Sequence, residues 1–197
     1  MVYFGYTIAT YSILILVTHI FSSVEKGDES YSFDYNAILA STPSEILATT
    51  IVLLSVDRVG RVPSATVSYA IASFAAFGLC FFASQSTSPR GLLIVFSFLA
   101  RGGIFSGSCV TWLATAELLP TEVRAAGHSI LNAIGRLSAA MSPFLVAPGR
   151  AYMVSGSVVA VILLAVALAS SALNETKGRA MGLISGSSSV TNGNGIV

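Results

Sequence analysis

Long apolar stretches, separated by short polar turns, make up most of this chain. Crossing the hydrocarbon core of a bilayer, about 30 Å thick, takes about 20 predominantly apolar residues in a helix. Six stretches meet or approach that length, at residues 2–21, 35–56, 62–83, 92 to about 118, 125–146 and 152–173. Pro43 and Glu45 interrupt the second of them. The pattern predicts an all-α membrane protein with six transmembrane helices.

The composition supports a chain that is surrounded by lipid. Hydrophobic residues make up 54% of the sequence and charged residues 10%, whereas about a quarter of a soluble domain is charged. A net charge of +1 argues against a nucleic-acid binder, which requires a basic patch. Cys80 and Cys109 lie inside apolar stretches, and their spacing indicates neither a metal site nor a disulfide framework. We therefore expect the bilayer as the main partner and no cofactor.

The turns indicate the domain limits and the topology. Residues 1–181 form the predicted bundle, and the tail at 182–197, rich in Gly, Ser and Asn, is expected to be disordered. Lys and Arg are enriched in short cytoplasmic loops. One set of turns holds Arg58, Arg61, Arg124, Lys177 and Arg179, and the other holds Lys26, Arg90 and Arg150. The richer set is predicted to be cytoplasmic, which places both termini there; the sequence does not indicate which membrane.

Four of the stretches carry polar side chains at helical spacing. These are Thr7, Tyr11 and Thr18; Thr42, Glu45 and Thr49; Arg101, Ser108, Thr111 or Trp112, and Thr115; and His128, Asn132 and Arg136. Ionisable groups at membrane depth are costly and usually face a cavity or a partner. We therefore expect these four helices to enclose a polar interior, with the third and sixth as apolar supports. The candidate pathway residues are Tyr11, Glu45, Arg101, Trp112, Asn132 and Arg136.

A structural role is open for the same side chains. Arg101 and Arg136 can each satisfy carbonyl groups of a neighbouring helix and hold the bundle together without touching a solute. Glu45 and the aromatic residues have similar structural alternatives. The small residues Gly103 and Gly107, four positions apart, let helix backbones approach closely in lipid, so packing is the favoured interpretation there.

Motifs in the turns resemble those of a known family. Residues Asp57-Arg58-Val59-Gly60-Arg61 resemble the Asp-Arg-x-Gly-Arg signature of the major facilitator superfamily. Residues 117–124 are similar to its Glu-x-x-Pro-Thr-x-x-Arg signature, and residues 174–179 to its Pro-Glu-Thr-Lys-Gly-Arg segment. Arg136 and Pro143 match an Arg-x6-Pro pattern. Together the motifs resemble the branch that holds organic-ion transporters and synaptic-vesicle-protein-like transporters.

The sequence departs from the family pattern at a few positions. Val62 stands where a basic residue is usual, Pro43-Ser44 replaces a Pro-Gly pair, and Asn174 replaces a proline. The matched motifs belong to family helices seven to twelve, so the resemblance implies the C-terminal half of a major facilitator fold. Its missing partner would be an N-terminal half or a second half-chain.

The resemblance also implies a mechanism. Solute would bind near the midplane, among the helices that match seven, eight, ten and eleven, while two bundles rock around it. A charge cluster in the turns would latch the cytoplasmic side, and covalent catalysis is not expected. The candidate gate residues are Asp57, Arg58, Gly60, Arg61, Glu117, Arg124 and Glu175.

We therefore expect transport of a small organic ion or polar solute by alternating access, by a truncated or half-length secondary transporter. The alternative is a non-transporting membrane protein that associates with or regulates full-length transporters. A channel is less favoured, because nothing in the sequence resembles a selectivity filter. The solute and the coupling ion stay open at this point.

Overall fold

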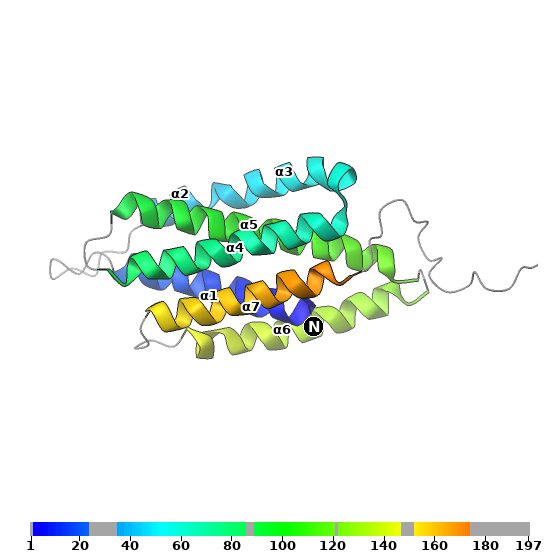
Figure 1. The fold of residues 1–197 in the computed structure, drawn as a ribbon. Coiled ribbons are helices and arrows are strands. Elements are labelled where there is room, and N and C mark those ends of the chain that lie inside the picture. Colours follow the sequence, from blue (N-terminus) through cyan, green and yellow to red (C-terminus); the bar gives the residue numbers. More distant parts are fainter. Residues whose placement is uncertain (1, 24–34, 86–88, 121, 147–151, 174–197) are drawn as a thin grey trace, which may run out of the picture.

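The structure is a computed structural model that describes residues 2–23, 35–85, 89–120, 122–146 and 152–173. Every regular element in these ranges is an α-helix (Figure 1). The helices are α1 (Val2–Ser23), α2 (Tyr35–Ser41), α3 (Pro43–Val59), α4 (Arg61–Ala83), α5 (Arg90–Leu118), α6 (Arg124–Leu145) and α7 (Tyr152–Ser171). The predicted all-α architecture is confirmed, and the predicted ranges agree with the helices to within a few residues. The predicted tail lies outside the described residues.

The second predicted span is divided at Pro43, where the sequence predicted an interruption, and its two pieces still make up one apolar span, Tyr35–Val59. Helix α2 ends at Ser41 and α3 begins at Pro43. Proline has no amide N–H, so it cannot continue the hydrogen-bond ladder of the preceding helix. The next available bond is a tighter one, from the Glu45 amide to the Thr42 carbonyl at 3.2 Å. Because Thr42 keeps helical backbone angles, the two pieces still follow one path.

Five helical spans are long and apolar enough to cross a membrane: α1, α2 with α3, α4, α5 and α7. Helix α6 has 22 residues, about 33 Å at 1.5 Å per residue, so it has the length. Its polar face, which carries His128, Asn132 and Arg136, lowers its hydropathy. The opposite face exposes Ile130, Leu137 and Phe144. Helix α6 is therefore amphipathic, as a helix between lipid and a polar interior would be.

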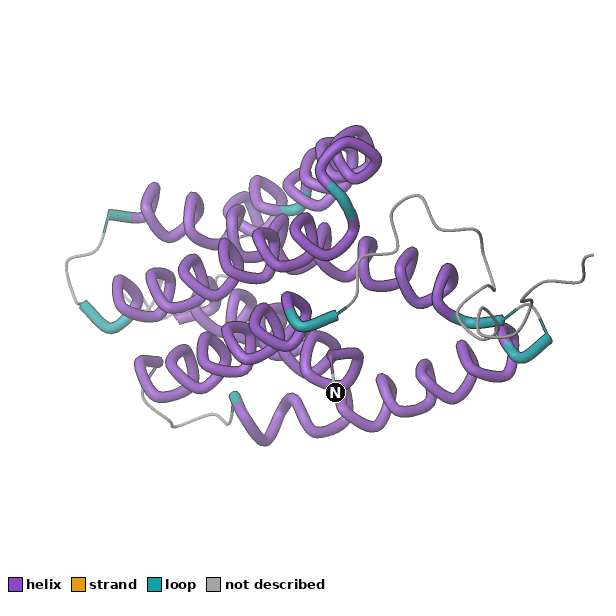
Figure 2. Tube along the Cα trace, turned by 45° about the vertical axis from the view of Figure 1, so that its right-hand side comes forward, coloured by secondary structure: helices purple, strands orange, loops and turns teal. Residues whose placement is uncertain are grey.

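Helices α4 and α7 form the most closely packed pair, and α4 also packs along α5. Helix α1 joins α7 to α6, and α3 rests mainly on α5. Figures 1 and 2 accordingly place α3 and α6 at opposite edges of the bundle. Fully buried side chains such as Tyr69, Leu79 and Leu163 fill the centre. The expectation that the third and sixth spans are the supports agrees with this packing.

Two glycines of predicted importance have clear structural reasons. Gly60 joins α3 to α4 with φ of 111°, a conformation that glycine adopts without the steric cost of a Cβ. Gly103 lies against α4, where an added Cβ would stand 3.0 Å from both the Ala72 nitrogen and the Ser68 carbonyl oxygen. The close approach expected from the small-residue pattern is present, between α5 and α4.

We predict that Gly103→Ala destabilises the bundle. Backbone atoms cannot move aside as a flexible side chain can, so we expect a cost of about 1–3 kcal/mol, the usual range for overpacking. The measurement is the thermal unfolding midpoint in detergent by circular dichroism. Gly91→Ala is the matched control, because nothing lies within 4 Å of a Cβ added there. Equal midpoints for the two variants would contradict the close contact.

Candidate functional site

A pocket of about 310 Å³ opens between α1, α5 and α6. Four of the six predicted pathway residues line it: Tyr11, Trp112, Asn132 and Arg136. Its other lining residues are Tyr3, Tyr6, Thr7, Thr10, Leu14, Phe105, Ser108 and Gly135. The polar faces of three of the four helices singled out by spacing therefore meet around one space.

Aromatic side chains form one wall of this pocket. The indole nitrogen of Trp112 donates a hydrogen bond to the Tyr6 hydroxyl at 2.8 Å. Tyr3 meets the Tyr6 ring edge-to-face at 4.9 Å between centroids. On the other side of Trp112, the His128 ring lies 5.3 Å away. Tyr3 and Tyr6 are buried, while Tyr11 and Trp112 are each 46% exposed, so fixed rings support two rings that a ligand can reach.

Helix α6 contributes the charge and the amide of the pocket. Gly135 lets α6 approach α1, since a Cβ there would lie 3.1 Å from the Tyr3 ring. This approach brings the neighbouring Arg136, and Asn132 one turn away, to the pocket. Both side chains are exposed. Within the described part of the chain, the Arg136 guanidinium has no hydrogen bond and no ion pair, so its donors are available to a bound anion.

The other two predicted pathway residues pair with each other. The Arg101 Nε donates to Glu45 Oε1 at 3.0 Å, and Nη2 of the same guanidinium contacts that oxygen as well. The two side chains are 12% and 24% exposed, respectively. Neither residue lines the aromatic pocket, although Arg101 lies one turn from Phe105 on the same face of α5. Their pathway role stays a prediction, and the pair itself holds α3 to α5.

A second charged cluster joins the ends of α3, α4 and α5. The Arg61 guanidinium holds the Glu117 carboxylate with Nε at 3.2 Å from both oxygens and Nη2 at 3.0 Å from Oε1. Its Nη1 reaches Asp57 at 3.2 Å. The Arg124 side chain donates to the Leu119 carbonyl, 3.3 Å from Nε and 3.2 Å from Nη2. This bond stabilises an end carbonyl of α5, which helix geometry leaves without an internal partner.

Of the predicted gate residues, Asp57, Gly60, Arg61 and Glu117 meet at this end of the bundle. Arg58 belongs to the same turn, and Glu175 lies outside the described residues. Sequence reasoning missed Tyr3, Tyr6 and Phe105 as pocket residues. Tyr3 stands four positions before Thr7 of the predicted stripe, a helical spacing that could have found it, whereas Tyr6 stands five positions before Tyr11, which is not such a spacing. Thr18, part of the predicted stripe of α1, does not line the pocket.

We predict that the Glu45–Arg101 pair shows strong energetic coupling. Arg101→Met would leave the Glu45 carboxylate without its cation at membrane depth. Because both groups are partly exposed, we expect a loss of about 1–3 kcal/mol, below the 3–5 kcal/mol of a fully buried pair. Glu45→Gln combined with Arg101→Met removes both charges and should cost less than the two single changes added together. Unfolding midpoints in detergent measure this, and strictly additive losses would contradict it.

Comparisons with known proteins give the family. The model of the sugar (and other) transporter family matches residues 3–185. The chain is similar to the synaptic vesicle 2-related proteins of Rattus norvegicus (32% identical over 75% of this chain) and Xenopus laevis (33% over 57%), and to solute carrier family 22 member 2 of Homo sapiens (31% over 61%). The alignments cover 27%, 20% and 20% of these relatives. The family match spans nearly the whole helical bundle, and the chain therefore belongs to the sugar (and other) transporters of the major facilitator superfamily, in the synaptic-vesicle-2-like branch.

Proposed function

We propose that this chain forms one half of a secondary transporter, and that its aromatic pocket is part of the site for a small organic anion. The observation that carries the proposal is the Arg136 guanidinium, which lies in a pocket of membrane-spanning helices without a described protein partner. Arginine at membrane depth usually faces a water-filled space or a partner. Family membership supports a transporter that performs no covalent chemistry.

The charge balance of the bundle favours an anionic group on the solute. Arg101 and Glu45 neutralise each other, so neither leaves a net charge for a ligand. Arg136 then supplies a positive charge that a carboxylate, sulfate or phosphate group would balance. The planar guanidinium fork holds such groups with two parallel hydrogen bonds. The broader class of solutes is organic ions and polar molecules. We narrow it to anions because the positive charge of Arg136 is not neutralised by a described side chain.

The remaining pocket residues suit the organic part of such a solute. Tyr11 and Trp112 present exposed ring faces, and Phe105 adds an apolar surface. The Asn132 amide and the Ser108 hydroxyl add polar groups at the same pocket. Ligand sites commonly combine an apolar lining with a few polar groups that fix orientation. An aromatic or branched organic anion fits this lining better than an inorganic ion does.

Alternating access requires a second bundle, which we propose packs against α3 and α6. These two helices have few buried residues: Ser44 and Val56 on α3, and Gly135, Ser138 and Ser142 on α6. Both lie at the edges of the bundle (Figure 2). An N-terminal half or a second half-chain would close the pocket of α1, α5 and α6 from its open side. The chain spans about a fifth to a quarter of the relatives' length.

We further propose that the cluster of Arg61, Glu117 and Asp57 latches one face of the transporter. The excess of Lys and Arg in these turns makes that face cytoplasmic, with both termini on the same side. Arg58, Gly60, Arg124 and Glu175 complete the proposed gate. An ion-pair cluster at helix ends can break and re-form as two bundles rock, which gives the gate two arrangements.

A second candidate is a non-transporting partner of full-length transporters. The exposed apolar residues of α3, such as Leu53 and Leu54, favour an association with another protein. Two measurements separate the candidates. A half-transporter takes up solute when its second bundle is present, and a regulator co-purifies with a larger relative but gives no uptake of its own in reconstituted vesicles.

We predict that Arg136→Ala sharply reduces uptake of an organic anion by the full-length gene product. Losing hydrogen bonds to a charged group costs about 1.5–3 kcal/mol, or about 10–100-fold in uptake at low solute concentration. Arg136→Lys keeps the positive charge but loses the two-pronged guanidinium, so its uptake should lie between that of the wild type and that of Arg136→Ala. A panel of radiolabelled anions, zwitterions and cations measures the effect, with surface expression quantified in parallel.

Ser129→Ala is the control on the same helix, because that hydroxyl bonds its own helix at the Ala125 carbonyl. It should leave uptake unchanged. Wild-type uptake by Arg136→Ala would remove this arginine from the pathway. Uptake of cations alone across the panel would overturn the anion assignment while leaving the transporter assignment in place.

We predict that Glu117→Ala slows transport without preventing membrane insertion. The change removes the hydrogen bonds that Nε and Nη2 of Arg61 donate to the Glu117 carboxylate. It therefore weakens the latch between α4 and α5. The exchanged pair Arg61→Glu with Glu117→Arg should recover part of the lost rate, because it restores the attraction. Initial uptake rates normalised to surface protein test this. Full activity of Glu117→Ala would show that the cluster is no gate.

A further inference from the structure

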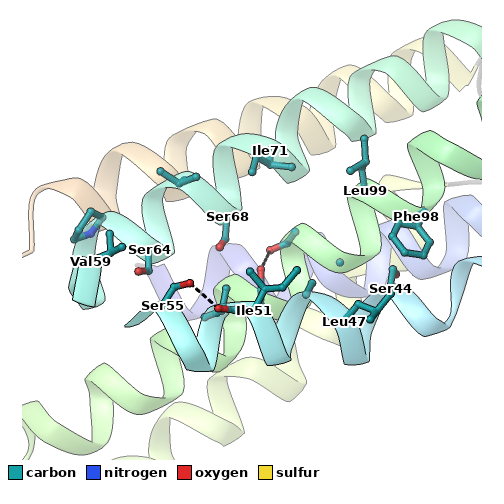
Figure 3. Close-up of a pocket in the computed structure, with 17 residues that line it drawn as sticks. Ser44, Leu47, Ile51, Ser55, Val59, Ser64, Ser68, Ile71, Phe98 and Leu99 are labelled. Carbon is teal, nitrogen blue, oxygen red and sulfur yellow. Dashed lines mark hydrogen bonds between the residues drawn. The ribbon is translucent and has the colours of Figure 1, made fainter. Parts of the chain in front are cut away.

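A second, larger hollow lies on a different side of α5 from the aromatic pocket. Its volume is about 520 Å³, within the range of about 300–1,000 Å³ that ligand pockets usually have. Residues of α3 and α4 form its two walls, and Phe98, Leu99, Gly102, Gly103 and Ser106 of α5 form its floor (Figure 3). We call it the α3–α4 trough. It shares no lining residue with the aromatic pocket.

The small residues of the floor explain why the trough exists. Gly102 allows α3 to pack closely, since a Cβ there would lie 3.2 Å from the Cβ of Ala48. Gly103 allows the close approach of α4 in the same way. Both helices therefore sit close to α5, while they make few contacts with each other. The Gly60 turn joins them at one end, where Val59 and Pro63 line the trough. A long hollow is left between them, open to the surroundings of the bundle.

The trough has the length of a lipid chain. Its lining on α3 runs from Ser44 to Val59, about 22 Å along the helix axis. The walls are mostly apolar, with exposed side chains such as Leu47, Ile51 and Val67. Because α3 and α4 belong to spans long and apolar enough to cross a membrane, we expect hydrocarbon chains at this opening. The second bundle would then pack on the face of α3 that carries Ile46, Leu53 and Leu54, which do not line the trough.

Two hydroxyl groups indicate that the occupant of the trough carries a hydrogen-bond acceptor in addition to a hydrocarbon chain. Ser64 and Ser68 are only 8% and 6% exposed, and Figure 3 shows both pointing from α4 toward α3. In the described part of the chain neither hydroxyl has a hydrogen-bond partner. By contrast, the nearby Ser55 and Ser106 hydroxyls bond carbonyls of their own helix, and the Ser44 hydroxyl bonds the Ser41 carbonyl at the end of α2. Two donors are therefore left facing the open trough, where a bound group can accept their hydrogen bonds. In the described residues the hydroxyls of Ser12, Ser97 and Ser170 also lack a partner, but they are fully enclosed.

From this geometry we infer that the α3–α4 trough binds one acyl chain of a membrane phospholipid, with the ester carbonyl of that chain accepting hydrogen bonds from Ser64 and Ser68. The two serines lie about 5 and 11 Å along the helix from Arg61, near the charged turn of Asp57 and Arg58, where a headgroup would lie. The ester group follows directly below the headgroup in such a lipid. The chain then runs along the trough toward Leu47 and Phe98. The inference is independent of what the transporter carries.

The test uses the purified full chain in phosphatidylcholine vesicles that contain a phosphatidylcholine with a photoactivatable group in one acyl chain. After irradiation, mass spectrometry maps the labelled peptides. We expect labelling of α3 and of the first half of α4 to exceed that of the exposed face of α7 several-fold. Even labelling of all lipid-exposed helices would overturn the inference, because it would indicate a general lipid annulus only.

Two pairs of variants make the test specific. Ile51→Trp fills the trough from a side chain that is 63% exposed and should reduce its labelling several-fold, whereas Val161→Trp, at a 65% exposed position of α7, should not. Ser64→Ala with Ser68→Ala removes the two donors and should weaken labelling, while Ser157→Ala, whose hydroxyl bonds the Val154 carbonyl, should leave it unchanged. Unchanged labelling in Ile51→Trp would contradict the trough as the site.

The same experiment distinguishes other occupants. If adding a sterol to the vesicles abolishes the labelling, the trough is a sterol site and the acyl-chain assignment is wrong. If the photoactivatable lipid fails to label while cross-links join α3 or α4 to a second protein chain, a protein covers the trough. Labelling that survives sterol and stays confined to α3 and α4 supports the assignment.

Discussion

The organisation of this protein depends on how a chain in hydrocarbon satisfies its polar groups without water. Lipid offers no hydrogen bonds, so each backbone group must be paired inside its own helix, and side chains must find partners in the protein or face a cavity. Most of the Ser and Thr hydroxyls described here bond a carbonyl three or four residues earlier, as Thr7 does to Tyr3 at 2.8 Å. Tyr69 and Thr111 pair across α4 and α5 at 2.7 Å, and Ser73 donates to the Ala160 carbonyl of α7 at 2.8 Å. The few charges follow the same rule in the ion pairs Arg101–Glu45 and Arg61–Glu117.

The packing of the helices follows from the same scarcity of polar contacts. Without a hydrophobic force between helices in lipid, close approach of small residues and hydrogen bonds hold them together. The principal contacts pair the first three spans with the last three: α4 with α7, α3 with α5, and α1 with α6. Contacts between the first three spans and the last three are expected, because each half of a major facilitator transporter consists of three-plus-three inverted repeats. The helices at the two edges, α3 and α6, leave the most surface uncovered. The aromatic pocket opens beside α6, and the α3–α4 trough opens beside α3.

The groups to which we assign ligands depart from the general rule, as do the enclosed hydroxyls of Ser12, Ser97 and Ser170, which have no hydrogen-bond partner in the described part of the chain. Arg136 lies in a pocket without a described partner, and Ser64 and Ser68 face a trough without one. Departures from local consistency are expected at functional sites, since other interactions must compensate for them. The two sites lie on different sides of α5, one among aromatic side chains and one among aliphatic ones. A polar solute and a lipid chain are the corresponding occupants that we propose, and α5 is the helix that both would contact.

The sequence by itself determined the spans, the Gly60 turn and the shared face of His128, Asn132 and Arg136, because helix length, backbone freedom and the 3.6-residue period act locally. It also placed Tyr11 and Trp112 on the polar faces that meet at the pocket. Only the tertiary structure decided that Arg101 pairs with Glu45, that Tyr3 and Tyr6 support Trp112, and that α3 and α4 leave a trough between them. These features join residues far apart in the chain, such as Glu45 and Arg101, which are 56 positions apart. Their contacts depend on how helices rotate and cross when they pack, and no local pattern of residues specifies that.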